Sequence, residues 1–108
     1  MYYPRYVKVP KDVYFKALQI AGSYYELKKR RKKFKGMERQ NKINEWQIRA
    51  IEDAMHSAAK DESERIFIAK NLFEGVQMSY IPLPMSQSTM KRVRREFLDR
   101  LVENLGLM

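Results

Sequence analysis

The chain has 108 residues, of which 44% are hydrophobic, a net charge of +9 and no cysteine. This length supports one domain with one hydrophobic core, and the lack of cysteine excludes disulfide bonds, thiolate zinc sites and a cysteine nucleophile. No apolar run approaches the roughly 20 residues of a membrane span or forms a signal peptide, so we expect a cytoplasmic protein that does not contact membranes.

The excess positive charge is concentrated in the first third of the chain. Residues 1–35 hold 11 cations and two acids, which gives 11 − 2 = +9, whereas residues 36–108 hold 11 of each. Because a dense run of cations repels itself, it favours a polyanionic partner over a merely solvated helix end. We therefore predict phosphate contacts for the seven cations of residues 28–35, with an acidic protein as the alternative partner. These cations are Lys28, Lys29, Arg30, Arg31, Lys32, Lys33 and Lys35.

The first predicted helix follows an N-terminal segment, Met1 to Val9, that should be extended because it contains Pro4. Pro10 and Asp12 suit a helix start, and apolar and aromatic residues then recur at helical spacing. The pattern predicts one helix from Lys11 to about Lys33. Its regularly spaced tyrosines favour a core or interface stripe over a base-stacking platform; they are Tyr14, Tyr24 and Tyr25.

Gly36 should end this helix, and polar residues should continue as a loop to Lys42, so that residues 28–42 form a basic connection. Asn44 and Gln47 match a capping box, which predicts the start of the second helix. Ile43 and Ile48 occupy the two positions of a hydrophobic staple. The single histidine, His56, should be an exposed or hydrogen-bonded helix residue, and we assign no metal.

Asp61 and Glu64 repeat the capping-box spacing and open a third predicted helix, Glu62 to about Glu74, which Gly75 ends. Acids in a first helical turn stabilise the helix dipole, and we favour this role over carboxylate catalysis. Between Gly75 and Ser86, Pro82 and Pro84 exclude a regular helix and leave room for at most one turn before them.

The last predicted helix runs from Gln87 to Leu105, with Ser86 as its cap and Gly106 in a left-handed conformation at its end. Its first half carries four cations, and its apolar residues leave one polar surface exposed. That surface contains Gln87, Ser88, Lys91, Arg92 and Arg95. Helix-surface ion pairs of Arg92 with Glu96 and of Arg95 with Asp99 are a competing explanation for two of these cations.

The chain from Asp61 onward resembles the C-terminal region of phage and prophage transcriptional regulators of the ArpU and RinA type, which look like region four of sigma factors. The shared features are the acidic cap with Glu64-Arg65, the helix stop at residues 73–75, the Ser-x-Ser-Thr entry at residues 86–89 and the ending at residues 101–106. One departure is the segment from Tyr80 to Pro84, where such proteins have a short helix before the recognition helix.

This resemblance implies a helix-turn-helix protein that reads duplex DNA in a bacterial host cell and is encoded by a phage or prophage. The base-facing candidates are Gln87, Ser88, Lys91, Arg92 and Arg95. The phosphate candidates on the same helix are Ser86, Thr89 and Arg94.

Taken together, the sequence predicts an all-α, single-domain bundle of about four helices, with residues 61–108 as its helix-turn-helix-like DNA-binding part. We expect sequence-specific duplex DNA binding by a late-gene activator, and no enzymatic activity, cofactor or small-molecule ligand, because no phosphate loop or nucleophile-base pair is present. The alternatives are a module that docks on RNA polymerase or on packaging machinery, and a small terminase-like packaging protein. The sequence is compatible both with a homodimeric regulator and with a monomeric one.

Overall fold

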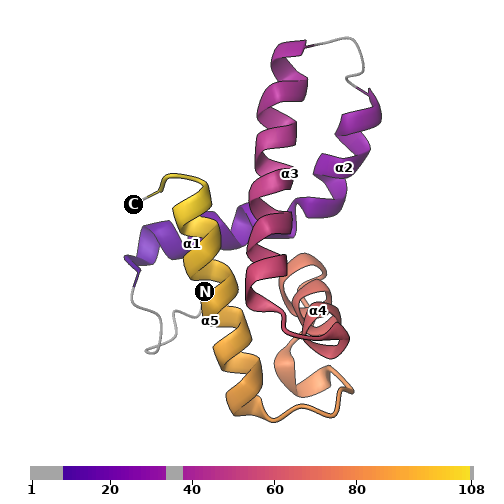
Figure 1. Cartoon of the computed structure of the whole chain (residues 1–108), viewed down its shortest axis with the longest axis vertical. Coiled ribbons are helices and arrows are strands. Elements are labelled where there is room, and N and C mark those ends of the chain that lie inside the picture. Colours follow the sequence, from indigo (N-terminus) through magenta and orange to yellow (C-terminus); the bar gives the residue numbers. More distant parts are fainter. Residues whose placement is uncertain (1–8, 34–37, 108) are drawn as a thin grey trace.

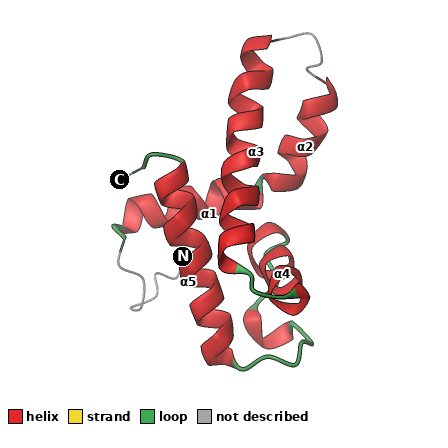
Figure 2. Cartoon of the chain, in the orientation of Figure 1, coloured by secondary structure: helices red, strands yellow, loops and turns green. Residues whose placement is uncertain are grey.

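The computed structural model describes residues 9–33 and 38–107 (Figure 1). All regular secondary structure in these two ranges is helical (Figure 2). The elements are α1 (Lys11–Gly22), α2 (Tyr24–Lys33), α3 (Glu38–Ala58), α4 (Glu62–Ile68), a π-helical segment (Ala69–Phe73), a 3-10 turn (Met78–Tyr80) and α5 (Gln87–Asn104). The predicted all-α bundle is therefore confirmed.

The helices form a lower bundle and a projecting hairpin (Figure 1). The lower bundle consists of α1, α4, α5 and the C-terminal half of α3, in which α4 and α5 pack against α3 and against each other, and α1 crosses behind. The α2–α3 hairpin consists of α2 and the N-terminal half of α3, which run side by side beyond the bundle. The molecule measures 44 × 28 × 24 Å, and the hairpin extends along its longest axis.

The hydrophobic core lies where the four helices of the lower bundle meet. Tyr14, Phe67 and Phe97 are fully buried there, one each from α1, α4 and α5. Phe73 joins this core to the base of the hairpin, because its ring centroid lies 6.1 Å from that of Phe97 and 4.5 Å from that of Tyr24. Aromatic packing thus continues from the bundle into α2.

The predicted single helix from Lys11 to Lys33 is wrong, because α1 ends at Gly22 and α2 begins at Tyr24. The Ser23 hydroxyl donates a hydrogen bond of 2.9 Å to the carbonyl of Gln19, four residues earlier. Glycine has a low helix propensity, and serine competes for backbone hydrogen bonds, so this pair is a weak point in a helix. The break redirects the chain, and α2 packs on α3.

The predicted second helix begins too late, because α3 starts at Glu38 and the expected loop to Lys42 is helical from that residue onward. Asn44 is not a cap. Its side chain is buried within α3, and its Nδ2 donates a hydrogen bond of 2.8 Å to the carbonyl of Leu27 in α2. The staple is also wrong, since Ile43 is 58% exposed. The tertiary contact with α2 supplies a partner that the local sequence does not reveal.

The remaining helix boundaries follow the predicted local signals. Asp61 accepts a hydrogen bond from the backbone N–H of Glu64, and Ser86 accepts one from that of Thr89. Gly75 and Gly106 have φ angles of 75° and 66°, the left-handed conformation expected after a helix. Before the two prolines the chain makes a single 3-10 turn. These caps fix the two ends of α5 and the start of α4.

Candidate nucleic-acid interface

The first turn of α5 lies at the lower end of the molecule and is exposed (Figure 1). The Ser86 hydroxyl accepts a hydrogen bond from the Thr89 backbone N–H at 3.1 Å and donates one to Thr89 Oγ1 at 3.0 Å. Thr89 is itself half-buried. Gln87, Ser88 and Lys91 are all exposed. Their amide, hydroxyl and ammonium groups can therefore reach an external ligand without any rearrangement of the bundle.

Arg92, which is also a predicted base-facing residue, is held by two carboxylates. Its Nη2 lies 2.9 Å from Oε2 of Glu64, and its Nη1 lies 3.5 Å from Oε2 of Glu96. Glu64 is only 6% exposed, and its other oxygen accepts a hydrogen bond from the backbone of Lys60. Since a buried carboxylate is costly to leave unpaired, Arg92 holds α5 against α4 and would have to release Glu64 to contact a base.

Arg94 lies on the inner side of α5 and connects it to two other elements. Its Nη2 donates a hydrogen bond of 2.8 Å to the hydroxyl of the fully buried Tyr14, and its Nη1 donates to Oδ1 of Asn71. Asn71 in turn donates to the carbonyl of Val76. The predicted phosphate contact of Arg94 would compete with these bonds. Arg95 is half-buried, as Arg94 is.

The cations of α2 lie in the upper half of the molecule, whereas α5 starts at its lower end (Figure 1). Lys28, Lys29 and Arg30 are exposed, and the Lys28 ammonium lies 5.2 Å from the ring centroid of Tyr24. Arg31 forms an ion pair with Glu45 of α3. Lys32 and Lys33 belong to α2, and Lys35 lies outside the described residues. The structure therefore does not bring the two predicted groups of cations together.

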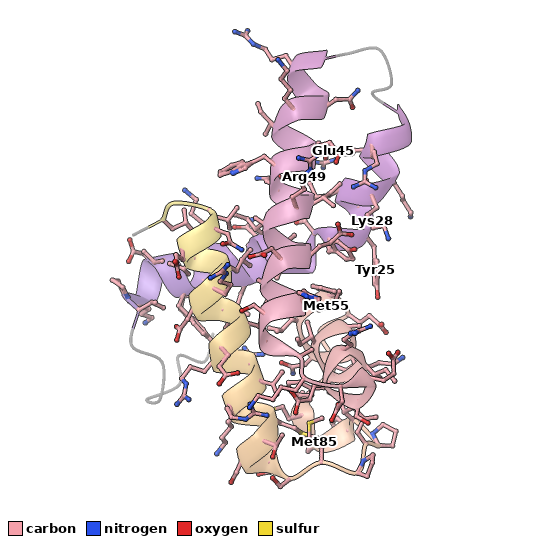
Figure 3. The ribbon with its side chains drawn as sticks, in the orientation of Figure 1. Tyr25, Lys28, Glu45, Arg49, Met55 and Met85 are labelled. Atoms are coloured by element: carbon pink, nitrogen blue, oxygen red, sulfur yellow. The ribbon has the colours of Figure 1, made fainter. Side chains whose placement is uncertain are left out.

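The outer surface of α2 contains a small hollow of about 250 Å³ lined by Tyr25, Lys28, Lys29 and Arg31. Tyr25 and Lys28 are labelled on this helix in Figure 3. Tyr25 is 46% exposed, whereas Tyr14 and Tyr24 are buried, so the predicted core stripe is confirmed for two of the three tyrosines. The two ammonium groups beside this hollow suit the oxygens of a phosphate, whereas the Tyr25 hydroxyl donates a hydrogen bond to Oε2 of Glu74 at 3.4 Å.

The α3 side of the hairpin is also cationic, although none of its residues is among the predicted sites. Arg39, Lys42 and Arg49 are exposed and recur at intervals of three and seven residues on one side of the helix. They flank Trp46, which is 49% exposed beside a groove of about 550 Å³. The helical spacing of these residues would have identified the surface if the helix had been predicted to start at Glu38.

The base of the hairpin is fastened by a hydrogen bond between Tyr24 and Glu52. The Tyr24 hydroxyl donates to Oε2 of Glu52 at 2.6 Å. Burial of the phenol, together with the neighbouring carboxylate, raises the pKa of Tyr24 far above its ordinary value. The phenol therefore stays protonated, which keeps it a donor that joins α2 to α3.

A second cluster fastens the end of α5 to the middle of α3. Arg100 Nε and Asn104 Nδ2 donate hydrogen bonds of 3.0 and 2.8 Å to Oδ2 of Asp53. These two bonds, that from Arg100 first, hold the pKa of the Asp53 carboxyl below its usual value. Asn104 also donates to the carbonyl of Ala50 at 3.1 Å. These bonds hold the last turn of α5 against α3 beside Ala50 and Asp53.

Within residues 9–33 and 38–107, no helix combines the length and apolar character needed to cross a membrane. The same ranges contain no cluster of three or more histidine, aspartate or glutamate side chains that could hold a metal ion. Comparison of the chain with known protein families, with curated proteins and with solved structures found no match.

Proposed function

We propose that the protein binds duplex DNA and inserts the start of α5 into the major groove. The observation that supports this proposal is the capped, exposed first turn of an 18-residue helix whose opposite face is buried. Gln87, Ser88 and Lys91 project from this turn, and the edges of bases in the major groove pair well with amide, hydroxyl and ammonium groups. Such reading suits the phage-type transcriptional regulator that the sequence resemblance implies.

The side-chain bonds of α5 narrow the set of residues proposed to read bases. Arg92 and Arg94 are bonded within the bundle, whereas Gln87, Ser88 and Lys91 are exposed and Arg95 is partly so. We therefore assign base contacts to Gln87, Ser88 and Lys91, and keep the partly exposed Arg95 as a further candidate. Each good bidentate contact discriminates between bases by about 1–3 kcal/mol.

The exposed cations of α2 would add affinity that does not depend on sequence. Each phosphate that a lysine or arginine neutralises releases a counterion and contributes about −0.9 to the salt slope. Because α2 lies in the upper half of the molecule and α5 starts at its lower end, a single duplex would have to run along the 44 Å axis to reach both. At about 3.4 Å per base pair, the full 44 Å axis corresponds to about 13 base pairs, so the stretch between the two groups is shorter than this.

The experiment that tests the proposal is selection of bound duplexes from a random DNA pool at near-physiological salt. We expect an enriched motif, and Lys91→Ala should change the preferred base at one position of it. The matched control is Lys29→Ala, which should weaken binding to all sequences alike and reduce the salt slope by about 0.9. Binding without an enriched motif, or an identical effect of the two substitutions, would contradict base reading by α5.

A length series tests whether both groups of cations contact one duplex. Two duplexes that contain the selected motif, one of 10 base pairs and one of 20, are compared for binding to the native chain and to Lys29→Ala. We expect Lys29→Ala to weaken binding of the longer duplex only. An equal loss on both duplexes would place α2 beside the motif itself and would contradict the extended arrangement.

A further inference from the structure

The apolar stripe of α3 that packs against α5 continues beyond the end of α5. Ala54 and Ala50 lie on this stripe and are 0% and 5% exposed, and the last bond from α5 is the one that Asn104 donates to the Ala50 carbonyl. The next members of the stripe toward the tip of the hairpin are Trp46 and Ile43. These two side chains are 49% and 58% exposed. The lower half of one helix face is thus covered, and its upper half is not.

Ile43 and Trp46 form a continuous patch because residues three apart are neighbours on a helix surface. The other large exposed apolar side chains in the described chain lie on other elements: Tyr25 on α2, Ile66 on α4 and Tyr80 in the 3-10 turn. Scattered apolar residues are normal on a protein surface, but adjacent ones mark sites of association. Tryptophan in particular is enriched among the residues that dominate binding energies.

The charges around this patch define the partner that would fit it. Arg39, Lys42 and Arg49 are exposed at its rim, and Figure 3 shows Arg49 and Glu45 one turn apart on this part of α3. Among the described side chains around the patch, Glu45 is the acid, and its carboxylate is bonded to Arg31 of α2. The rim is therefore positive. Two copies of this face would bring like charges together, which disfavours self-association.

We propose that the patch of Ile43 and Trp46 docks an amphipathic helix of a partner protein that carries large apolar residues flanked by aspartate or glutamate. The partner helix takes the place on α3 that α5 leaves uncovered, with its acids against Arg39, Lys42 and Arg49. Nucleobases stack on aromatic rings, and half of this patch is the aliphatic side chain of Ile43. The patch therefore favours a protein partner over a nucleic acid. This inference goes beyond DNA binding and uses none of the residues assigned to base contacts.

The test is selection of binders to the full chain from a displayed library of random 16-residue peptides. We expect enriched peptides that are acidic and have apolar residues three or four apart. Synthetic versions should bind Ile43→Ser and Trp46→Ser at least tenfold more weakly than the native chain, and Arg49→Glu at least threefold more weakly. The matched control is Ile66→Ser, which removes an isoleucine of α4 that is 39% exposed and should leave binding unchanged.

Circular dichroism of each variant verifies that the helices remain. Enriched peptides without acids, peptides that bind Ile43→Ser normally, or no enrichment at all would overturn the proposal. Self-association of the native chain that Ile43→Ser abolishes would assign the patch to a homodimer instead. Competition by a 12-nucleotide single-stranded DNA that requires Trp46 would assign it to nucleobases. Lys91→Ala should not affect peptide binding, so failure of this proposal can be distinguished from failure of DNA binding.

Discussion

The lower bundle and the α2–α3 hairpin use their arginines and apolar residues differently. In the bundle, Arg92 and Arg94 are bonded to side chains of other helices. In the hairpin, Lys29 and Arg30 of α2 are exposed, although Arg31 pairs with Glu45 of α3, and Ile43 of α3 is exposed as well. The two cationic runs look alike as sequence, yet two arginines of the run in α5 hold helices together. A dense run of cations therefore locates an interface only after its bonds within the protein are known.

The largest expected effect is the difference in lost stability between a substitution in the bundle and one in the hairpin. Phe97 is fully buried, so Phe97→Ala should lower the free energy of unfolding by about 3–5 kcal/mol through lost burial and the cavity that remains. Ile43→Ala, on the exposed hairpin surface, should change it by no more than about 0.5 kcal/mol. Urea denaturation measures both. Similar losses would mean that Ile43 is buried in solution.

The next effect is a difference in lost stability between substitutions of two neighbouring cations of α5. Arg92→Ala leaves the buried Glu64 carboxylate without its guanidinium and should cost about 1–3 kcal/mol of folding free energy. Lys91→Ala removes an exposed side chain and should leave stability within about 0.5 kcal/mol. Thermal denaturation and DNA binding are measured on both variants. If Arg92→Ala weakened DNA binding without loss of stability, the arginine would act at the DNA and not within the bundle.

A smaller effect should appear in alkali, at the junction between hairpin and bundle. Tyr24 has a folded pKa raised above its unfolded value of about 10, so its contribution to stability is complete below pH 10 and is lost as pH rises toward the folded pKa. The free energy of unfolding should fall by at most about 1.4 kcal/mol per pH unit in this range. Tyr24→Phe should remove most of this decline, whereas Tyr25→Phe should remove a smaller part of it, because partial burial and Glu74 also raise the pKa of this more exposed phenol.

The smallest effect concerns Asp53, which joins α3 to the end of α5 at the surface. Its folded pKa is lowered, so its stabilising effect is present above the unfolded value of about 3.9 and is lost as pH falls through the folded pKa. Carboxyl-carbon NMR should give a titration midpoint below 3.9. Arg100→Gln should raise this midpoint. An unchanged midpoint would show that Arg100 does not contact Asp53 in solution.

Local sequence signals were sufficient to predict the boundaries that depend on local bonds. Ser86 and Asp61 cap helices through N–H groups three residues away, and Gly75 and Gly106 follow helix ends in the left-handed conformation. Such bonds close within one helical turn, so the two bonded residues are only a few positions apart in the sequence. The all-α class follows in the same way from the spacing of apolar residues within each helix.

Features that depend on distant partners could not be predicted from these signals. Asn44 looks like a cap, but its partner is the carbonyl of Leu27, 17 residues away. Arg94 looks like a surface cation, but it bonds Tyr14, 80 residues away. Neither partner can be identified before the helices are packed. The proposed base contacts of Gln87, Ser88 and Lys91 remain predictions, because exposure permits DNA binding without requiring it.

The position of Trp46 has a spectroscopic consequence. It is the chain's single tryptophan and lies on the hairpin, while the tyrosines buried in the protein include Tyr14 in the lower bundle. Tryptophan emission should therefore report on the hairpin surface, and near-ultraviolet tyrosine signals should report on buried packing, at Tyr14 in the bundle and at Tyr24 where the hairpin joins it. If the hairpin frays before the bundle melts, the two signals will change at different temperatures, so one unlabelled sample can reveal whether the molecule unfolds in one step or two.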